Sequence, residues 1–507
     1  MNTKGRRKAL GFETSIFRPF LFASSLFQVE TLRNGVYTVM SLKYAVTKVG
    51  ENHYVLPKTG SMKVEAHAFL SEDLYNSSEE SVWDQIRNGA SYEGVIGAYL
   101  MPDCHVGYGV PVGSVIVTED TIIQGGSGYD ISCGVLYMKA DLKAGAVKGK
   151  HDRRRWVTEV ERRIATGVGS SRPDLMPEFR KNQADEILRY GAKALGVSAD
   201  LCERQYIPVP EGIDLSKIEK AYTKVIPQLG SVGGGNHFVE MQCDRDTGEV
   251  YIMVHCGSRG YGWQTANHFF YEGAKVRGLP SNRREESWLR ADEALGKEYW
   301  AYHNSAANFA VANRHIIVNG IREATQEVFG GDVEVYYEIS HNLVQEETLV
   351  LPDGTVKRGF VHRKGATRAF PAGHPDLKGT VWEATGHPCL IPGSMYEGAA
   401  ILFAGAGAHK SACSVNHGSG RTMARGKAKR QLEHKQQRID DEMATVKRTF
   451  NGVQIEGIMS NHRHIPLDEC AHVYKDLDAV LGVLEAEGIA RVEHRLYPVA
   501  NIKGADG

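Results

Sequence analysis

The chain has no apolar run that approaches the roughly 18 consecutive residues required by a membrane-spanning helix. It also has no excess of one charge, because 60 basic and 61 acidic residues leave a net charge of -1. This balance excludes a generally basic nucleic-acid coat protein, so any polyanion must meet a local patch of positive charge. Internal repeats and low-complexity tracts are absent as well. These absences predict a soluble protein with no membrane partner.

Closely and evenly spaced cysteines are also lacking, since the eight cysteines are spread over all 507 residues. A chain of this length can bury a sizeable core and does not need disulfide bonds to hold it together. We therefore expect reduced thiols and a cytoplasmic location.

No linker rich in proline, glycine or serine suggests a domain boundary after residue 40. We expect one large domain, residues 40–507, of mixed α/β (α+β) class, with central β-sheets, helices and glycine-rich active-site loops. Residues 1–39 differ, because a basic cluster precedes an apolar run that Arg18 and Pro19 interrupt. We interpret residues 1–39 as a disordered extension or a mis-assigned start, and a targeting peptide is the alternative.

The 55 glycines are concentrated around a few motifs. Residues 125–134 read GGSGYDISCG and contain Asp130 and Cys133. Such crowding argues against an ordinary helix or strand and leaves the backbone free to turn both potential ligands toward one point. A structural turn with a buried cysteine is the alternative.

Three histidines occupy comparable positions beside predicted strands. His255 and His341 each follow an apolar run predicted as a strand, and His237 lies in a glycine-rich loop that leads into one. A strand end is a rigid place from which to aim a ligand. The residue types suit two divalent ions bridged by a thiolate, and the set is Asp130, Cys133, His237, His255 and His341. Zn, Mn, Fe and Co all remain open, and each histidine alone could be an ordinary core residue.

A second chemical motif is NHGSGR at residues 416–421. It is predicted to open a helix, so that His417 would lie at a helix start. A histidine there can attack phosphorus when a metal neutralises the phosphate oxygens, and the backbone N–H groups of Gly233–Gly235 could cradle the phosphate. A helix-capping turn with an incidental histidine is the alternative.

Three charged segments are predicted to be helical, namely residues 150–204, 282–328 and 421–448. The first carries a basic cluster from Arg153 to Arg163, which we interpret as a solvated face, with nucleic-acid contact as the alternative. The basic residues after His417 could guide a nucleic-acid backbone or could equally form a solvated face.

These motifs resemble those of the RtcB family of RNA ligases. The similarity covers residues 40–507, from PDCH at 102–105 through GNH at 235–237 and SHN at 340–342 to HGSGR at 417–421 and Lys503. The resemblance implies a GTP- and Mn²⁺-dependent ligase that joins an RNA 3′-phosphate or 2′,3′-cyclic phosphate to a 5′-hydroxyl end. It further implies a guanylylated histidine, an RNA-ppG intermediate and, for part of the family, the activating partner archease.

The resemblance also implies residue roles. Asp130, Cys133 and His237 would bind one Mn²⁺, and Cys133, His255 and His341 would bind the other. His417 would become guanylylated, with Asp103 and His105 as support. The guanylate pocket would comprise Asn236, His237, Phe238, Val239, Glu240, His341, Asn342, Pro392, Gly393, Ser394, Met395, His417, Gly418, Ser419, Gly420 and Lys503. The chain departs from the family pattern at Ser127, Tyr129, Ser132, Ala399 and Asn416, and none of these is an implied ligand or the nucleophile.

Two alternatives to the ligase remain at this point. The first is a two-metal phosphodiesterase or cyclic-phosphate hydrolase, in which metal-bound water reacts and His417 only binds. The second is an RNA-binding or accessory protein without activity. The complete ligand set argues against the second, and the retained guanylate-pocket motifs argue against the first.

Overall fold

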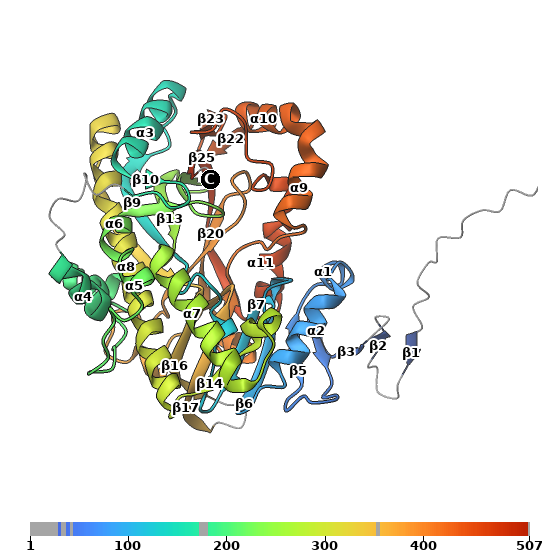
Figure 1. Cartoon of the computed structure of the whole chain (residues 1–507). Coiled ribbons are helices and arrows are strands. Elements are labelled where there is room, and N and C mark those ends of the chain that lie inside the picture. The colour runs from blue at the N-terminus through green and yellow to red at the C-terminus, as the bar shows by residue number, and fades with distance from the viewer. Residues whose placement is uncertain (1–28, 32–36, 41–43, 172–180, 351–354, 505–507) are drawn as a thin grey trace, which may run out of the picture.

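The computed structural model describes residues 29–31, 37–40, 44–171, 181–350 and 355–504. Two large, mainly antiparallel sheets form its centre (Figure 1). The first contains, in spatial order, β1 (Val29–Thr31), β2 (Tyr37–Met40), β3 (Ala45–Lys48), β4 (His53–Leu56), β5 (Ala66–Phe69), β6 (Val95–His105), β7 (Val112–Thr118), β17 (Val356–Lys364) and β16 (Asn342–Val350). The second contains β15 (Val333–Ser340), β9 (Gly134–Lys143), β13 (Glu249–Cys256), β12 (Phe238–Asp244), β25 (Ala490–Lys503), β20 (Ala399–Ala404) and β19 (Pro388–Pro392), with β24 (Met459–Ser460) beside β25.

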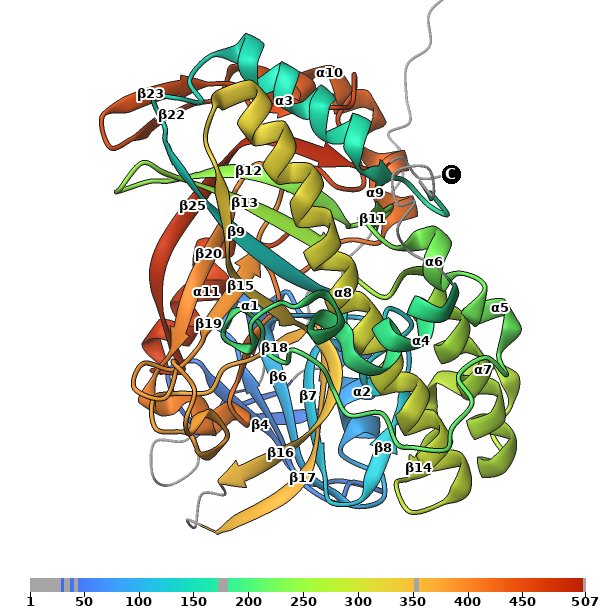
Figure 2. The same cartoon turned by 90° about the vertical axis from the view of Figure 1, so that its left-hand side faces the viewer.

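Two helices cover one face of the second sheet (Figure 2). They are α3 (Lys150–Arg163) and α8 (Ala294–Phe329). Trp156 of α3 and Ile321 of α8 are buried in the same hydrophobic cluster as Ile252 of β13. The 36-residue helix α8 ends at Gly330, whose φ of 75° is the left-handed conformation that glycine adopts most easily.

Further helices pack around this core. They are α1 (Glu72–Asn76), α2 (Glu80–Gly89), α4 (Lys181–Tyr190), α5 (Glu219–Tyr222), α6 (Val225–Gln228), α7 (Arg259–Arg277), α9 (Arg425–Leu432), α10 (Gln436–Thr445) and α11 (Leu477–Ala486). Small two-stranded ladders join β8 (Thr121–Ile123) to β14 (Trp288–Arg290), β10 (Ala165–Thr166) to β11 (Ser231–Gly233), β18 (Ala366–Arg368) to β21 (Ser414–Asn416), and β22 (Lys447–Phe450) to β23 (Val453–Glu456). The mixed α/β class predicted from the sequence is confirmed. None of the helices within the described ranges is long and apolar enough to span a membrane.

All three helix predictions were wrong in part. Residues 150–204 are interrupted after α3, where Ile164 turns into an extended conformation that leads to β10. The helix expected from residue 282 begins only at Ala294, because Trp288–Arg290 pair with β8 and bury Leu289. The helix expected at 421–448 begins at Arg425 and is interrupted by a 3₁₀ turn after Leu432.

The predicted domain boundary at residue 40 stays a prediction. Most of residues 1–39 lie outside the described residues, and β2 crosses the boundary to pair with β3. The basic cluster on α3 is solvated only in part, since Arg154, Arg155 and Arg162 are exposed while Arg153 and Arg163 make internal contacts. Arg153 is fully buried and donates to the carbonyls of Gly457 and Val499, while Arg163 is paired with carboxylates of its own helix and of α8.

Candidate active site

The edge of the second sheet brings the predicted metal ligands together. Strands β15, β9 and β13 are neighbours, and their register places Ser340 and Cys256 on either side of Gly134. Cys133, His255 and His341 therefore meet where these three strands end, and their ligand atoms lie within 4.8 Å of one another. Asp130, Cys133 and His237 satisfy the same criterion, so Cys133 belongs to both groups. This geometry is compatible with metal binding.

The distances within the centre are short. The Cys133 Sγ atom lies 3.2 Å from His255 Nε2 and 3.4 Å from His237 Nε2. His237 Nε2 lies 2.9 Å from Asp130 Oδ2, and His255 Nε2 lies 3.2 Å from His341 Nε2. The sulfur and the imidazole nitrogens thus face a common space, as ligands of a shared ion would.

Backbone carbonyls orient two of the imidazoles. His237 Nδ1 donates to the carbonyl of Val232 at 3.0 Å, and His255 Nδ1 donates to that of Asn236 at 3.1 Å. Because Nδ1 is occupied by the carbonyl, Nε2 is the ring atom that faces the centre and is left to bind a metal, which is the arrangement that metal-ligating histidines use.

The electrostatics of the centre favour neutral imidazoles at His255 and His341. Burial, together with the neighbouring histidines, holds the pKa of His255 and of His341 well below the usual value of 6.5. Burial also works to raise the pKa of Asp130, but its interactions with His237, Cys133 and Arg259 together outweigh this and lower the pKa to about 2. The pKa of the Cys133 thiol is raised well above its usual value by burial and by the Asp130 carboxylate. A bound cation would reverse that last effect, because it favours the thiolate.

Two glycines allow this close packing. A Cβ atom on Gly257 would lie 2.3 Å from Asp130 Oδ1, and a Cβ on Gly134 would lie 2.4 Å from the carbonyl oxygen of Ile339. The glycines around the motif therefore serve close approach of the backbone to the ligands and to β15.

Arg314 of α8 supports the centre from within the core. Its fully buried guanidinium donates to the carbonyls of Ser132 (2.8 Å) and Cys256 (2.7 Å) and pairs with Glu338. Ser132, which departs from the family pattern, has a left-handed φ of 57°. Its hydroxyl lies 2.7 Å from that of Ser340. A further group that could hold a metal consists of Cys202, His315 and Glu338, and Glu338 is the residue that pairs with Arg314.

The predicted nucleophile lies beside a buried carboxylate. His417 Nδ1 lies 2.5 Å from Asp103 Oδ2, which also accepts from the backbone N–H groups of His417 (3.2 Å) and Gly418 (3.3 Å). Asp103 is completely buried, whereas the His417 side chain is 18% exposed. Asp103 therefore fixes the proton on Nδ1 and leaves Nε2 as the open nitrogen. The His417 and His341 ring centroids are 5.1 Å apart.

The helix start predicted at His417 was wrong. Residues 414–416 form β21, and the chain turns through the glycines before α9 begins at Arg425. Gly420 has a φ of 75°, and a Cβ there would lie 2.1 Å from the Asp103 carbonyl oxygen. The turn thus packs His417 against the strand that carries Asp103.

A cavity of about 430 Å³ unites most of the predicted pocket with the metal-capable centre. The predicted residues that line it are Cys133, Asn236, Phe238, Glu240, His255, His341, Asn342, Pro392, Gly393, Ser394, Met395, His417, Gly418, Ser419, Gly420 and Lys503. His237 and Val239, also predicted for this pocket, do not line it. Side chains alternate along β12, and that of Val239 packs in the core against α3 and α8. Ala399 is fully buried and does not line this cavity.

The far end of the cavity combines an acid with a cation. Burial raises the pKa of Glu240 to about 7, against hydrogen bonds from Gln242 and Asn501. The Lys503 Nζ atom donates to Glu469 Oε2 at 2.5 Å and lies 5.6 Å from the centre of the Phe238 ring. A planar polar ligand could meet both charged groups here.

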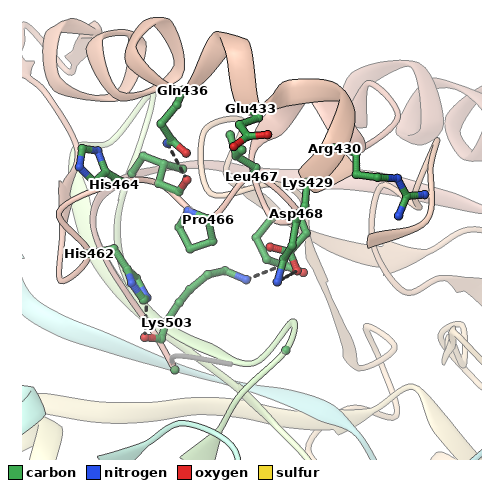
Figure 3. A pocket seen from close by; sticks show the side chains of 14 residues that line it. Lys429, Arg430, Glu433, Gln436, His462, His464, Pro466, Leu467, Asp468 and Lys503 are labelled. Carbon is green, nitrogen blue, oxygen red and sulfur yellow. Dashed lines mark hydrogen bonds and ion pairs between the residues drawn. The ribbon is translucent and has the colours of Figure 1, made fainter. Parts of the chain in front are cut away.

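Sequence reasoning missed the loop that carries Glu469. This carboxylate pairs with Lys503, Arg421 and Arg425, and the Tyr474 hydroxyl donates to it at 2.7 Å. Arg421, Arg425, Glu469 and Tyr474 all line the cavity. No glycine motif marks residues 461–475, and the strand before them, β24 (Met459–Ser460), has only two residues, so nothing in the local sequence distinguished them. Figure 3 shows Lys503 reaching toward this loop, across a neighbouring cavity of about 620 Å³.

Comparison with known proteins assigns the chain to a family. A family model described as "tRNA-splicing ligase RtcB" matches residues 85–504. A protein named tRNA-splicing ligase RtcB from Thermococcus kodakarensis is 31% identical over 491 residues, which cover 90% of this chain and 98% of that protein. The protein of the same name from Archaeoglobus fulgidus is 32% identical, covering 92% of this chain and 100% of its own length. RNA-splicing ligase RtcB of Mycobacterium tuberculosis is 32% identical, and the match covers 83% of this chain and 100% of that protein. The chain therefore belongs to the RtcB family.

Proposed function

We propose that the protein is an RNA ligase that uses GTP and two Mn²⁺ ions to join RNA 3′-phosphate or 2′,3′-cyclic phosphate ends to 5′-hydroxyl ends. The names of its relatives support RNA ligation. The observation that carries the proposal is the position of His417, which faces the same cavity as Cys133, His255 and His341 while Asp103 holds its Nδ1.

The residue types present fit two manganese ions. Asp130, Cys133 and His237 would hold one, and Cys133, His255 and His341 the other. Ions held there would neutralise phosphate oxygens during each displacement. The donor set by itself also suits zinc, iron or cobalt, so manganese is part of the proposal and follows from the family resemblance.

His417 is the proposed nucleophile. Its Nε2 would attack the α-phosphate of GTP, forming an N–P bond as pyrophosphate leaves. The guanylyl group would then pass to the RNA 3′-phosphate, which regenerates His417 and gives RNA-ppG. Attack by the 5′-hydroxyl forms the phosphodiester and releases GMP, and a cyclic phosphate is first hydrolysed. Asp103 stabilises the imidazolium character that develops on His417 in the first step, because its carboxylate holds the Nδ1 proton.

The guanine would occupy the end of the cavity lined by Glu240 and Lys503. The Lys503 ammonium is a donor and the Glu240 carboxylate an acceptor, which together suit the carbonyl and the N–H edge of guanine. Phe238 lies beneath Lys503 and offers an apolar surface.

The test is covalent labelling with α-labelled GTP and Mn²⁺. We expect acid-labile label on the wild type and none on His417→Ala. His409→Ala is the matched control and should label normally, because His409 is exposed, does not line the cavity that His417 faces, and its Nδ1 donates to the carbonyl of Ala406. Absence of label on the wild type, with metal bound and archease supplied, would overturn the proposal. Cyclic-phosphate hydrolysis without label would instead favour the two-metal hydrolase.

A further inference from the structure

A second cavity, of about 610 Å³, adjoins the metal-capable centre. Asn236 and Arg425 line both cavities, but this one reaches Asp130 and His237 rather than His255 and His341. Its volume lies within the range of roughly 300–1,000 Å³ typical of small-ligand sites. The centre can therefore be approached by two different groups at once, which a joining reaction requires.

The second cavity contains a fixed cation. Arg259 has a left-handed φ of 52°, an unfavourable conformation for a residue with a side chain. Its guanidinium lies so close to Gly233 that a Cβ there would be 2.0 Å from the nearer terminal nitrogen, and its Nε donates to the Ser231 hydroxyl at 3.2 Å. The strained backbone and the tight packing hold this charge beside Asp130, where it can meet a phosphate.

The same cavity has an exposed aromatic wall. Trp263 of α7 lines it and remains 47% exposed, although tryptophan is a large apolar side chain. Its ring stacks on Tyr129, with centroids 5.7 Å apart and an angle of 21° between the planes. The Tyr129 hydroxyl donates to Glu285 at 2.5 Å and accepts from Arg284 at 3.0 Å, so the ring beneath Trp263 is held in place. This arrangement leaves a supported aromatic surface at the mouth of a charged cavity.

We propose that Trp263 is a stacking platform for the terminal base of a single-stranded RNA end that enters this cavity beside Arg259. This proposal rests on the proposed function, since it names how that function holds its RNA. Every base has an aromatic face, so such a platform tolerates any sequence. A fixed guanidinium and an exposed indole, side by side next to metal-capable ligands, match a nucleotide better than they match an apolar small molecule.

The experiment compares RNA strands with and without their terminal base. Two strands are used separately, one with a 3′-phosphate and one with a 5′-hydroxyl, each intact or abasic at its terminal position, and binding is measured by fluorescence anisotropy. For one strand, loss of the base should weaken wild-type binding about 5- to 150-fold, from stacking of 1–3 kcal/mol per base at 1.4 kcal/mol per tenfold. The strand that responds is the one that occupies this cavity.

Variants of Trp263 test whether the affinity lost with the terminal base depends on the Trp263 ring. Trp263→Ala should bind the intact strand as weakly as the wild type binds the abasic one, and should no longer distinguish the two, whereas Trp263→Phe should restore part of the difference. Tyr190→Ala is the matched control, because Tyr190 lies at the end of α4, is 46% exposed and does not line the cavity.

The proposal is overturned if neither strand responds to loss of its base, or if Trp263→Ala still responds. It is also overturned if Tyr190→Ala loses as much discrimination as Trp263→Ala. Labelling of the wild type with α-labelled GTP is measured in parallel. Base-dependent binding without labelling would leave the stacking platform in place and refute the ligase chemistry, so the two failures are distinguishable.

Discussion

Asp103→Asn tests whether the buried carboxylate activates His417. The Asp103 Oδ2 atom accepts from the His417 imidazole and from two backbone N–H groups, while Oδ1 is buried without a partner among the described residues. In the variant, the amide can take two orientations. Its nitrogen either replaces Oδ1 and becomes a buried donor without a partner among the described residues, or replaces Oδ2 and faces three donors. Both orientations lose a charge-assisted hydrogen bond worth about 1.5–3 kcal/mol. We therefore expect histidine guanylylation to slow about 10- to 150-fold.

The assay is the single-turnover rate of labelling at saturating GTP and metal, so that the rate reports chemistry and not binding. Asp244→Asn is the matched control, because Asp244 is also buried and pairs with an imidazole, that of His494 at 2.8 Å, away from the cavity. It should lower thermal stability and leave the rate unchanged. A folded Asp103→Asn protein that labels within about twofold of the wild type would refute the reasoning.

Three further predictions concern metal, nucleotide and pH. Because Cys133 belongs to both metal-capable groups, Cys133→Ala should reduce bound manganese, measured by mass spectrometry after dialysis, below one ion per chain; retention of two would contradict the shared-ligand arrangement. Lys503→Met should raise the KM for GTP about tenfold, from loss of one charged hydrogen bond, with a small change in melting temperature because Glu469 keeps its arginine partners. The Asp244 interaction raises the pKa of His494 above its usual 6.5, and Asp244 itself has a pKa of about 2. The pair therefore stabilises fully between about pH 4 and 6.5 and less as pH rises further, so His494→Asn should lower the melting temperature more at pH 5.5 than at pH 8.5, and equal shifts would refute this.

The sequence allowed the candidate ligands to be selected but not their assembly to be derived. His255 lies near the end of β13 and His341 directly follows β15, and these apolar runs sufficed to select both as candidates. Their convergence on Cys133 depends on the order β15, β9, β13, which pairs residues about 120 and 200 positions apart. No periodicity within one segment encodes such long-range pairing, so only the family resemblance could divide the ligands between two ions.

Where local signals failed, tertiary contacts outweighed them. Trp288–Arg290 lie in a charged stretch with helical character but form a strand, because β8 supplies a pairing partner and Leu289 becomes buried. The glycines after His417 suggested a helix cap, yet Gly420 is required by its approach to the Asp103 backbone. In both cases the deciding neighbour lies more than 150 residues away in the chain.

The loop that carries Asp468 and Glu469 groups cations that the overall composition does not reveal. A chain with a net charge of -1 can bind a polyanion only through a local excess of cations. In the loop beside the cavity, Glu469 and Asp468 are surrounded by four cations, Lys503, Arg421, Arg425 and Lys429. The two carboxylates hold these side chains in position, so the cations at the cavity edge are ordered in the protein alone, and removing Glu469 would loosen Arg421 and Arg425.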